Sequence, residues 1–311
     1  MSTTVLGIDT SNYTTSLSVA CDGVVTENIK LPLPVKEGAL GLRQSDAVFH
    51  HTKNLPTAFE MLKTDLRDIS AIAVSTRPRG VDGSYMPCFL SGEGAGRMLS
   101  SALCLPLYRF SHQEGHLRAA IYSAGRDIYL HESFYGYHIS GGTFELLKCQ
   151  PKDDGFHAEV IGGTRDLTAG QAVDRTGVML GIPFPCGREA EQYALQNKEP
   201  LPPVKIAVKG LDASLSGIEN QTRKLYDEGK SKEFICAYLF RFLCLTIEKM
   251  TENLFKVHGD APLLFSGGVT ANGILRAYLQ KRFSCDFAEP AFSADNAAGV
   301  ALLGYDAYLK K

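Results

Sequence analysis

The amino-acid sequence lacks an excess of either charge, because 32 Lys and Arg residues stand against 34 Asp and Glu residues in 311 positions. A formal net charge of −2 provides no overall attraction to a nucleic-acid backbone, although it leaves room for a local basic patch. Low-complexity tracts are also absent, and hydrophobic residues make up 44% of the chain against 21% charged ones. These proportions exclude the disordered and fibrous classes and are typical of a folded globular protein.

Other absences bear on the compartment. The eight cysteines form no C-x-x-C pair and no zinc-knuckle spacing, and since they are scattered through apolar segments we expect reduced core residues. No apolar run reaches the ~18 residues of a membrane-spanning helix. The first residues run into a strand without the charged and apolar regions of a secretory leader. We therefore expect a cytoplasmic protein with no membrane partner.

The chain is long enough for two domains of ~150 residues each. It opens with β-branched runs at 4–8 and 16–21 around a polar turn, and then alternates helices with strands. A second start of the same type follows from about residue 127, with strands around the turn 140–143. The pattern predicts a mixed α/β fold of two related halves with a cleft between them. The helices expected from periodicity lie at about 44–66, 169–181, 187–196, 214–228 and 232–257.

Three turns rich in glycine and hydroxyl residues directly follow apolar strands. They are Gly7–Ser11, Ile139–Gly142 and Leu264–Gly268, and the last runs into a helix beginning near Asn272. Backbone N–H groups in such turns can hold phosphate oxygens, and glycine lets the chain approach a ligand closely. Each turn alone is better read as an ordinary tight turn, but three in a chain of two halves favour phosphate binding.

The sequence His112-Gln-Glu-Gly-His116 spaces two histidines so that both project from one helix face and can share a metal ion. Glu114 points elsewhere, so this is not the H-E-x-x-H order of the zinc peptidases. A third ligand would have to come from afar, and Asp295 is the candidate. The alternative for the two histidines is that they are polar residues at a helix start, and the alternative for Asp295 is that it caps the last helix. A mixed His and carboxylate set suits iron, zinc or manganese better than calcium.

A third constellation runs from Asp166 through Asp174 to the Pro- and Gly-containing loop before Glu191. A carboxylate on a helix, this loop and a further carboxylate would form a wall that binds the hydroxyl groups of a ribose. The alternative is a helix–loop–helix with solvated acidic residues.

In this order, the segments closely resemble the threonylcarbamoyladenosine synthase family, once catalogued as glycoproteases, within the actin-like and sugar-kinase-like ATPase superfamily. The family's motifs H-x-E-G-H, S-G-G-H-T and D-N-A-A correspond to 112–116, 140–144 and 295–298. Further counterparts of family motifs lie at 7–15, 166–175, 185–188, 214–218 and 267–272.

The resemblance implies two actin-like, ribonuclease-H-like subdomains with a nucleotide in the cleft. We expect residues 1–110 with 291–311 to form the first and residues 111–290 to form the second. Family members transfer a threonylcarbamoyl group from its adenylate to N6 of the tRNA adenosine beside the anticodon. The chain is therefore expected to be a metal-dependent protein that binds ATP or an adenylate.

Carried over by position, the resemblance implies metal ligands at His112, His116 and Asp295, with iron or zinc as the expected metal. It places the phosphate loop at Ser140, Gly141 and Gly142, and the ribose and adenine contacts at Asp174, Gly187, Glu191 and Asn272. The expected nucleotide- and substrate-binding set is completed by Asp9, Ser11, Thr143, Gly267 and Gly268. No residue is assigned as a catalytic acid or base.

Several positions depart from the family pattern. Tyr13 and Thr14 replace an acidic pair, Thr143 replaces a histidine, Gln171 replaces a glutamate and Cys186 replaces a glycine. The chain therefore resembles a divergent paralogue. Two further functions stay open, namely a non-catalytic nucleotide-binding paralogue that supports a true synthase, and a metallopeptidase. The partners implied are an adenine nucleotide, tRNA reached through partner proteins, a small actin-like paralogue and an ATPase.

Overall fold

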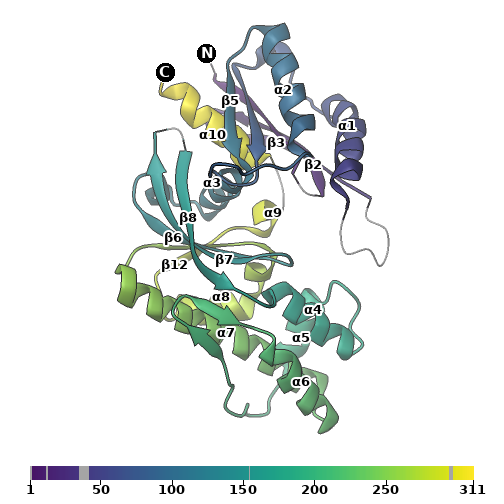
Figure 1. Cartoon of the computed structure of the whole chain (residues 1–311), viewed down its shortest axis with the longest axis vertical. Coiled ribbons are helices and arrows are strands. Elements are labelled where there is room, and N and C mark those ends of the chain that lie inside the picture. The colour runs from purple at the N-terminus through teal and green to yellow at the C-terminus, as the bar shows by residue number, and fades with distance from the viewer. Residues whose placement is uncertain (1, 12, 35–41, 154, 294–296) are drawn as a thin grey trace. The chain divides into compact units, whose positions relative to one another are not determined.

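The computed structural model describes residues 2–11, 13–34, 42–153, 155–293 and 297–311. Contacts divide the chain into unit 1, which contains residues 1–131, 150–158 and 291–311, and unit 2, which contains residues 132–149 and 159–290. Figure 1 follows the chain from purple at the N-terminus to yellow at the C-terminus. Segment 112–124, which the sequence analysis assigned to the second half, belongs to unit 1 because it packs against the C-terminal helix.

Unit 1 contains a five-stranded sheet in the order β3-β2-β1-β4-β5. The chain forms a meander of antiparallel strands first, and β1, β4 and β5 then run parallel. This confirms the hairpin predicted from the β-branched runs. The strands are β1 (Thr4–Asp9), β2 (Thr14–Cys21), β3 (Val24–Pro32), β4 (Ala71–Arg77) and β5 (Leu107–Ser111).

Helices cover both faces of this sheet, and every residue of β1 is therefore buried. Leu6 and Ile8 pack in the same core cluster as Leu55 of α1, whereas a Cβ atom on Gly7 would lie 2.7 Å from the Ala301 nitrogen of α10. The C-terminal helix thus lies beside the N-terminal strand (Figure 1). The helices of unit 1 are α1 (Gln44–Glu60), α2 (Phe89–Leu103), α3 (His112–Ala124) and α10 (Ala298–Leu309), with 3-10 turns η1 (Leu66–Asp68) and η2 (Asp127–Leu130).

Helix α1 ends at Glu60, earlier than the predicted end near residue 66. The Glu27 carboxylate on β3 accepts hydrogen bonds from the backbone N–H groups of Lys63 and Thr64, both at 2.8 Å. These tertiary hydrogen bonds hold the backbone after α1 in a turn that local periodicity does not reveal.

Unit 2 is built on a seven-stranded sheet in the order β12-β11-β6-β7-β8-β10-β9. As in unit 1, an antiparallel hairpin (β6–β7) adjoins parallel strands (β6, β11 and β12). The rings of Tyr137, Phe265 and Phe287 stack across these parallel strands with centroids 4.8 Å apart at each step. The strands are β6 (Phe134–Ile139), β7 (Phe144–Lys152), β8 (Gly155–Thr164), β9 (Ala207–Lys209), β10 (Asp212–Ser214), β11 (Leu263–Ser266) and β12 (Cys285–Phe287). The end of β7 from residue 150 and the start of β8 up to residue 158 are counted in unit 1.

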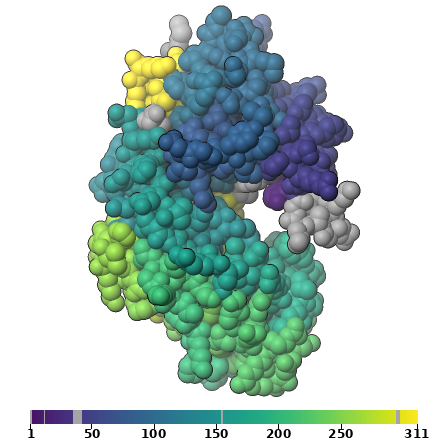
Figure 2. All heavy atoms as spheres, viewed as in Figure 1, coloured from purple at the N-terminus to yellow at the C-terminus, as the bar shows by residue number. Residues whose placement is uncertain are grey.

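The long helix α7 supplies most of the helical core of unit 2, as its apolar stripe predicted, and residues such as Phe240 and Leu243 are buried against α5. Side chains close the gaps between the ribbons of this unit (Figure 2). Among the described residues, no helix is long and apolar enough to cross a membrane. The helices of unit 2 are α4 (Ala169–Met179), α5 (Gly187–Gln196), α6 (Gly217–Asp227), α7 (Lys232–His258) and α8 (Gly273–Gln280), with the 3-10 turn η3 (Gly268–Ala271). The short α9 (Pro290–Ser293) follows β12 and belongs to unit 1 from residue 291 onward.

Candidate functional site

The parallel strands of unit 1 end at residues that the sequence analysis singled out. Strand β1 ends at Asp9, and β5 ends at Ser111, immediately before His112 begins α3. Ligands of open α/β sheets bind outside the carboxyl ends of the strands. This edge of the sheet is therefore the expected place for a site.

A capping box positions the first turn of α3. The Ser111 hydroxyl accepts a hydrogen bond from the Glu114 N–H at 3.2 Å, and the Glu114 carboxylate accepts one from the Ser111 N–H at 2.8 Å. The buried Glu114 carboxylate also lies 3.5 Å from the Lys152 ammonium group. The Glu114 carboxylate is thus held by the start of α3, so it is unsuited to act as a general base.

The two histidines of α3 lie against each other, with ring centroids 4.2 Å apart and an interplanar angle of 72°. Nδ1 of His112 is 2.8 Å from Oδ2 of Asp9, and because a carboxylate only accepts, Nδ1 donates this hydrogen bond. The other Asp9 oxygen accepts a hydrogen bond from the Ser11 N–H at 2.8 Å. Asp9, expected among the substrate-binding residues, thus fixes the orientation of the His112 ring through Nδ1.

This donor set fits a transition metal. Histidine ligands commonly donate their second ring nitrogen to a carboxylate, which fixes the tautomer and raises ligand basicity. The buried Ser11 hydroxyl has no hydrogen-bond partner within the part of the chain that the structure describes. In the same part, no third His, Cys, Asp or Glu completes a metal-binding group. The expected third ligand, Asp295, lies outside the described residues.

In unit 2, the second and third glycine turns meet at the carboxyl ends of β6 and β11. A Cβ atom on Gly267, whose φ is +98°, would lie 2.3 Å from the Ile139 carbonyl oxygen, so only glycine fits there. Ser140 N–H donates to the Thr143 carbonyl at 2.7 Å, and Thr143 N–H donates to the Ser140 hydroxyl at 3.1 Å. The turn is therefore preformed around Gly141, where a Cβ atom would meet nothing within 4 Å.

All four predicted ribose and adenine residues line one hollow of about 780 Å³, here called the unit 2 cavity. Its apolar wall includes Phe184, a residue that stays 75% exposed, and Val269. The sequence analysis missed both, although Phe184 stands between two prolines, a pattern that marks a rigid loop. The predicted residues that line the unit 2 cavity are Gly141, Asp174, Gly187, Glu191, Gly268 and Asn272. Ser140, Gly142, Thr143 and Gly267 lie in the adjoining turns.

Backbone hydrogen bonds hold the three polar side chains of the unit 2 cavity. Asp174 Oδ1 accepts from the Cys186 N–H at 2.9 Å, and Glu191 Oε1 accepts from the Gly273 N–H at 2.6 Å. Asn272 caps α8, with Oδ1 accepting from the N–H of Leu275 at 3.0 Å. Each side chain is therefore fixed through one atom and keeps a second oxygen or an amide N–H for a ligand.

Cys186, which replaces the family's glycine, is buried behind this wall. Burial first, and the nearby Asp174 carboxylate second, raise the pKa of its thiol, so it stays protonated and inert. Its side chain occupies space that Gly177 of α4 leaves free, because a Cβ atom on Gly177 would lie 2.4 Å from Cys186 Cβ. The glycine within α4 therefore accommodates the departure at Cys186.

Asp166 lies outside the unit 2 cavity and has a structural role. Its carboxylate accepts hydrogen bonds from the N–H groups of Leu215 and Ser216, at 2.9 and 3.1 Å, and from the Ser214 hydroxyl. Burial acts to raise the pKa of Asp166, but these hydrogen bonds outweigh it and hold the pKa well below its usual range. Asp166 thus connects the start of α4 to the loop before α6.

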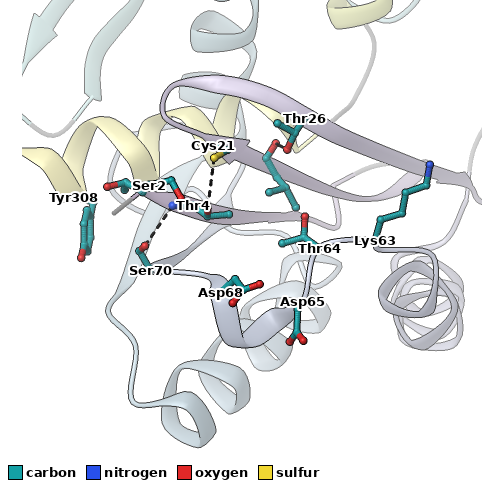
Figure 3. A pocket seen from close by; sticks show the side chains of 12 residues that line it. Ser2, Thr4, Cys21, Thr26, Lys63, Thr64, Asp65, Asp68, Ser70 and Tyr308 are labelled. Carbon is teal, nitrogen blue, oxygen red and sulfur yellow. Dashed lines mark hydrogen bonds between the residues drawn. The ribbon is translucent and has the colours of Figure 1, made fainter.

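A further hollow, of about 1000 Å³, lies in unit 1 and contains none of the predicted site residues. Figure 3 shows hydroxyl-bearing side chains such as Thr4 and Ser70 around it. Thr4 begins β1, and Ser70 precedes β4, so this hollow is at the amino ends of the parallel strands. Since ligands of such sheets bind at the carboxyl ends, the larger volume does not make it the candidate site.

Comparison with known proteins points to one family. The family model described as "tRNA N6-adenosine threonylcarbamoyltransferase" matches residues 41–302. A protein of that name from Christiangramia forsetii is 29% identical over 331 residues, covering 99% of this chain and 94% of its own length. A namesake from Thermus thermophilus is 30% identical over 309 residues, covering 97% of this chain and 92% of its own.

Solved structures establish the fold. Full-length HypF in its phosphate- and nucleotide-bound form is similar with a TM-score of 0.60 and 14% identity, covering 99% of this chain and 55% of HypF. Component A of the Acidaminococcus fermentans (R)-2-hydroxyglutaryl-CoA dehydratase has a TM-score of 0.55 and 14% identity, covering 97% of this chain and 98% of its own. The predicted α/β fold of the actin-like ATPase superfamily, with one sheet in each half, is thereby confirmed.

Proposed function

Since the chain belongs to the family of tRNA N6-adenosine threonylcarbamoyltransferases, we propose that it binds an adenine nucleotide ester in the unit 2 cavity and serves threonylcarbamoyl transfer to tRNA. One observation carries the proposal: residues from 141 to 272 converge on a single cavity that has fixed polar groups and an apolar wall. This combination is typical of small-molecule sites.

The polar groups of the unit 2 cavity match the parts of an adenylate. The second carboxylate oxygens of Asp174 and Glu191 accept hydrogen bonds from the ribose hydroxyl groups. The open backbone at Gly141 and Gly268 lets a phosphate approach N–H donors closely. The exposed Phe184 ring provides a face for the adenine.

In the family reaction, the adenosine N6 atom attacks the carbamoyl carbon of the threonylcarbamoyl adenylate, and the bond from that carbon to the phosphate oxygen breaks. AMP leaves, and the N6 nitrogen releases one proton to solvent. The N–H donors of the glycine turns stabilise the negative charge that develops on the phosphate. Asp174, Glu191 and Asn272 orient the leaving nucleotide through their fixed side chains.

We propose that His112 and His116 hold one divalent metal, iron or zinc, with Asp295 as the expected third ligand. A bound metal supplies Lewis-acid chemistry. Asp9 holds the His112 ring through Nδ1, as carboxylates commonly do for histidine ligands. This arrangement supports metal binding and counts against a peptidase, because Glu114 is held in the capping box.

A non-catalytic paralogue is the second candidate, favoured by the departures at Tyr13 and Thr143. We expect this chain alone to transfer threonylcarbamoyl to tRNA weakly or not at all. The test incubates the protein with threonine, bicarbonate, ATP, tRNA and the enzyme that makes the adenylate, and measures the modified nucleoside. Modification at the rate of a family member with the complete motifs would refute the paralogue.

Calorimetry tests nucleotide binding directly. The wild-type protein should bind AMP, ADP or ATP, and Asn272→Ala should weaken binding about tenfold, equivalent to roughly 1.4 kcal/mol. Asn220→Ala, an exposed change on α6, is the matched control and should bind as wild type. Absence of any adenine-nucleotide binding, with divalent metal present, would overturn the proposed function.

A further inference from the structure

Unit 2 has a second concave surface beside the cavity described above. It is a hollow of about 600 Å³ formed by α5, α7, α8 and the residues after α8, here called the basic groove. Its polar rim carries the cations of Arg241, Lys281 and Arg282. Leu195 and Ile274 provide apolar surface, and Tyr278 lies among the cations.

Contacts fix the Arg282 side chain. Its Nε donates to Glu248 Oε1 at 2.7 Å, and its guanidinium carbon lies 3.7 Å from the centroid of the Tyr278 ring. The Tyr278 hydroxyl donates to the other Glu248 oxygen at 2.5 Å. One carboxylate and one ring therefore hold the guanidinium group at the rim of the groove.

Arg241 also lies over the Tyr278 ring, but it has no carboxylate partner among the described residues. Its guanidinium carbon is 5.1 Å from the Tyr278 centroid, and neither Arg241 nor Lys281 makes an ion pair with any residue that the structure describes. Stacking on an aromatic ring orders a guanidinium group while leaving its N–H donors free at the edge. The groove thus presents ordered donors that no carboxylate occupies.

The acidic groups near the groove cancel its positive charge only in part. Glu248 pairs with Arg282, and Glu191 on the wall carries a second negative charge, so the three cations leave a net charge of +1 at the groove. The chain as a whole has a net charge of −2, so the positive charge of the groove is a local concentration. Clustered cations repel one another, and an anionic ligand relieves that repulsion.

We propose that the basic groove binds phosphate groups of an RNA backbone. The inference rests on the proposed function, in which the acceptor is tRNA. Guanidinium groups bind phosphate oxygens through paired N–H donors, and apolar surface beside them suits the sugar and base edges of RNA. Glu191 lines both the groove and the unit 2 cavity, so a backbone in the groove lies against the wall that holds the nucleotide.

Salt-dependent binding of labelled tRNA tests the groove. We compare the wild type with the double variant Arg241→Gln, Lys281→Gln. Loss of two phosphate contacts should weaken binding about tenfold at low salt and make the slope of log K against log salt shallower by roughly 1.4 to 1.8. The matched control, Arg223→Gln with Lys224→Gln, removes the same charge from α6 and should leave the affinity and slope unchanged.

Three outcomes would overturn the proposal that the basic groove binds RNA. These are equal losses in both double variants, no tRNA binding by the wild type, and displacement of tRNA by micromolar inorganic pyrophosphate, which would assign the groove to a free phosphate compound. AMP calorimetry on the same samples separates the two proposals. If the wild type binds AMP and the variant Arg241→Gln, Lys281→Gln leaves tRNA affinity unchanged, only the groove proposal is refuted. If the wild type does not bind AMP, the proposed function is refuted.

Discussion

Replacing Gly177 by Ala should destabilise unit 2 only while Cys186 is present. The new methyl carbon would lie 2.4 Å from Cys186 Cβ and 2.6 Å from its sulfur, whereas its next neighbour, Ile182 Cβ, is at an ordinary 3.7 Å. Carbon atoms pack best at roughly 3.5 to 4.0 Å. The clash therefore involves one side chain, and its Cβ atom cannot turn away.

The sizes of two opposing terms set the expected change. Overpacking of this kind costs about 3 kcal/mol, at the upper end of its usual range, because the overlap exceeds 1 Å. Alanine is favoured over glycine inside a helix such as α4 by about 1 kcal/mol. Gly177→Ala should therefore lower the free energy of unfolding by about 2 kcal/mol.

With Cys186→Gly as the background, the same Gly177→Ala change should stabilise the protein by about 1 kcal/mol, since only the helix term remains. The double-mutant cycle then gives a coupling energy of about 3 kcal/mol. Urea unfolding of the four proteins measures these differences. The Cys186 N–H also holds Asp174, so Gly177→Ala in the wild-type background should weaken AMP binding about fivefold, or roughly 1 kcal/mol.

A change of the same sign in both backgrounds would refute this reasoning. So would a coupling energy below about 0.5 kcal/mol, which is the scatter of independent sites. Either result would mean that Cys186 and Gly177 are not packed together, and the account of how the fold accommodates Cys186 would fail with it.

Four further predictions concern the sites. Gly268→Leu should reduce AMP affinity more than tenfold with an unchanged urea midpoint, because a Cβ atom there meets nothing within 4 Å, and unaltered affinity would contradict the cavity assignment. Asn272→Ala should also cost about 1 kcal/mol of stability through loss of the α8 cap, measured by urea unfolding, and an unchanged midpoint would show that the cap contributes nothing. His116→Ala should remove stoichiometric metal in elemental analysis without unfolding the protein. Asp9→Asn should keep the site with about 10- to 100-fold weaker metal affinity. Full metal occupancy in His116→Ala would disprove the site. The pKa of Asp166 is lowered in the folded state, so its contribution to stability is present above the ordinary aspartate value of 3.8 and is lost as pH falls below it. The difference in urea midpoint between wild type and Asp166→Asn should therefore shrink from pH 5 to pH 2. A constant difference would be inconsistent with this linkage.

Much of the fold follows from local patterns in the sequence. The β-branched hairpins, the helices α4 to α7 and the turn 140–143 lie within a few residues of their predicted positions. The sequence does not predict the strands β9 and β10, because three residues are too few to show a period. It does not predict the early end of α1 either, because the Glu27 carboxylate that binds the following backbone belongs to a distant strand.

The candidate residues divide in the same way. Spacing alone pairs His112 with His116, since four residues make one helical turn, and strand-to-turn order marks the glycine turns. Resemblance to family motifs identifies Asp174 and Glu191. These signals depend on residues close together in the chain or on a known pattern, so they can be read without coordinates.

Only the tertiary structure decides which distant side chains meet. It places Asp9 on His112 across 103 positions, assigns Asp166 to a structural role, and puts Arg241 and Arg282 over one tyrosine ring. Each of these contacts depends on how helices and strands pack, and a packing distance has no counterpart in sequence spacing. The residue types that can do the chemistry are therefore determined by the sequence, whereas packing determines which of them are free to do it.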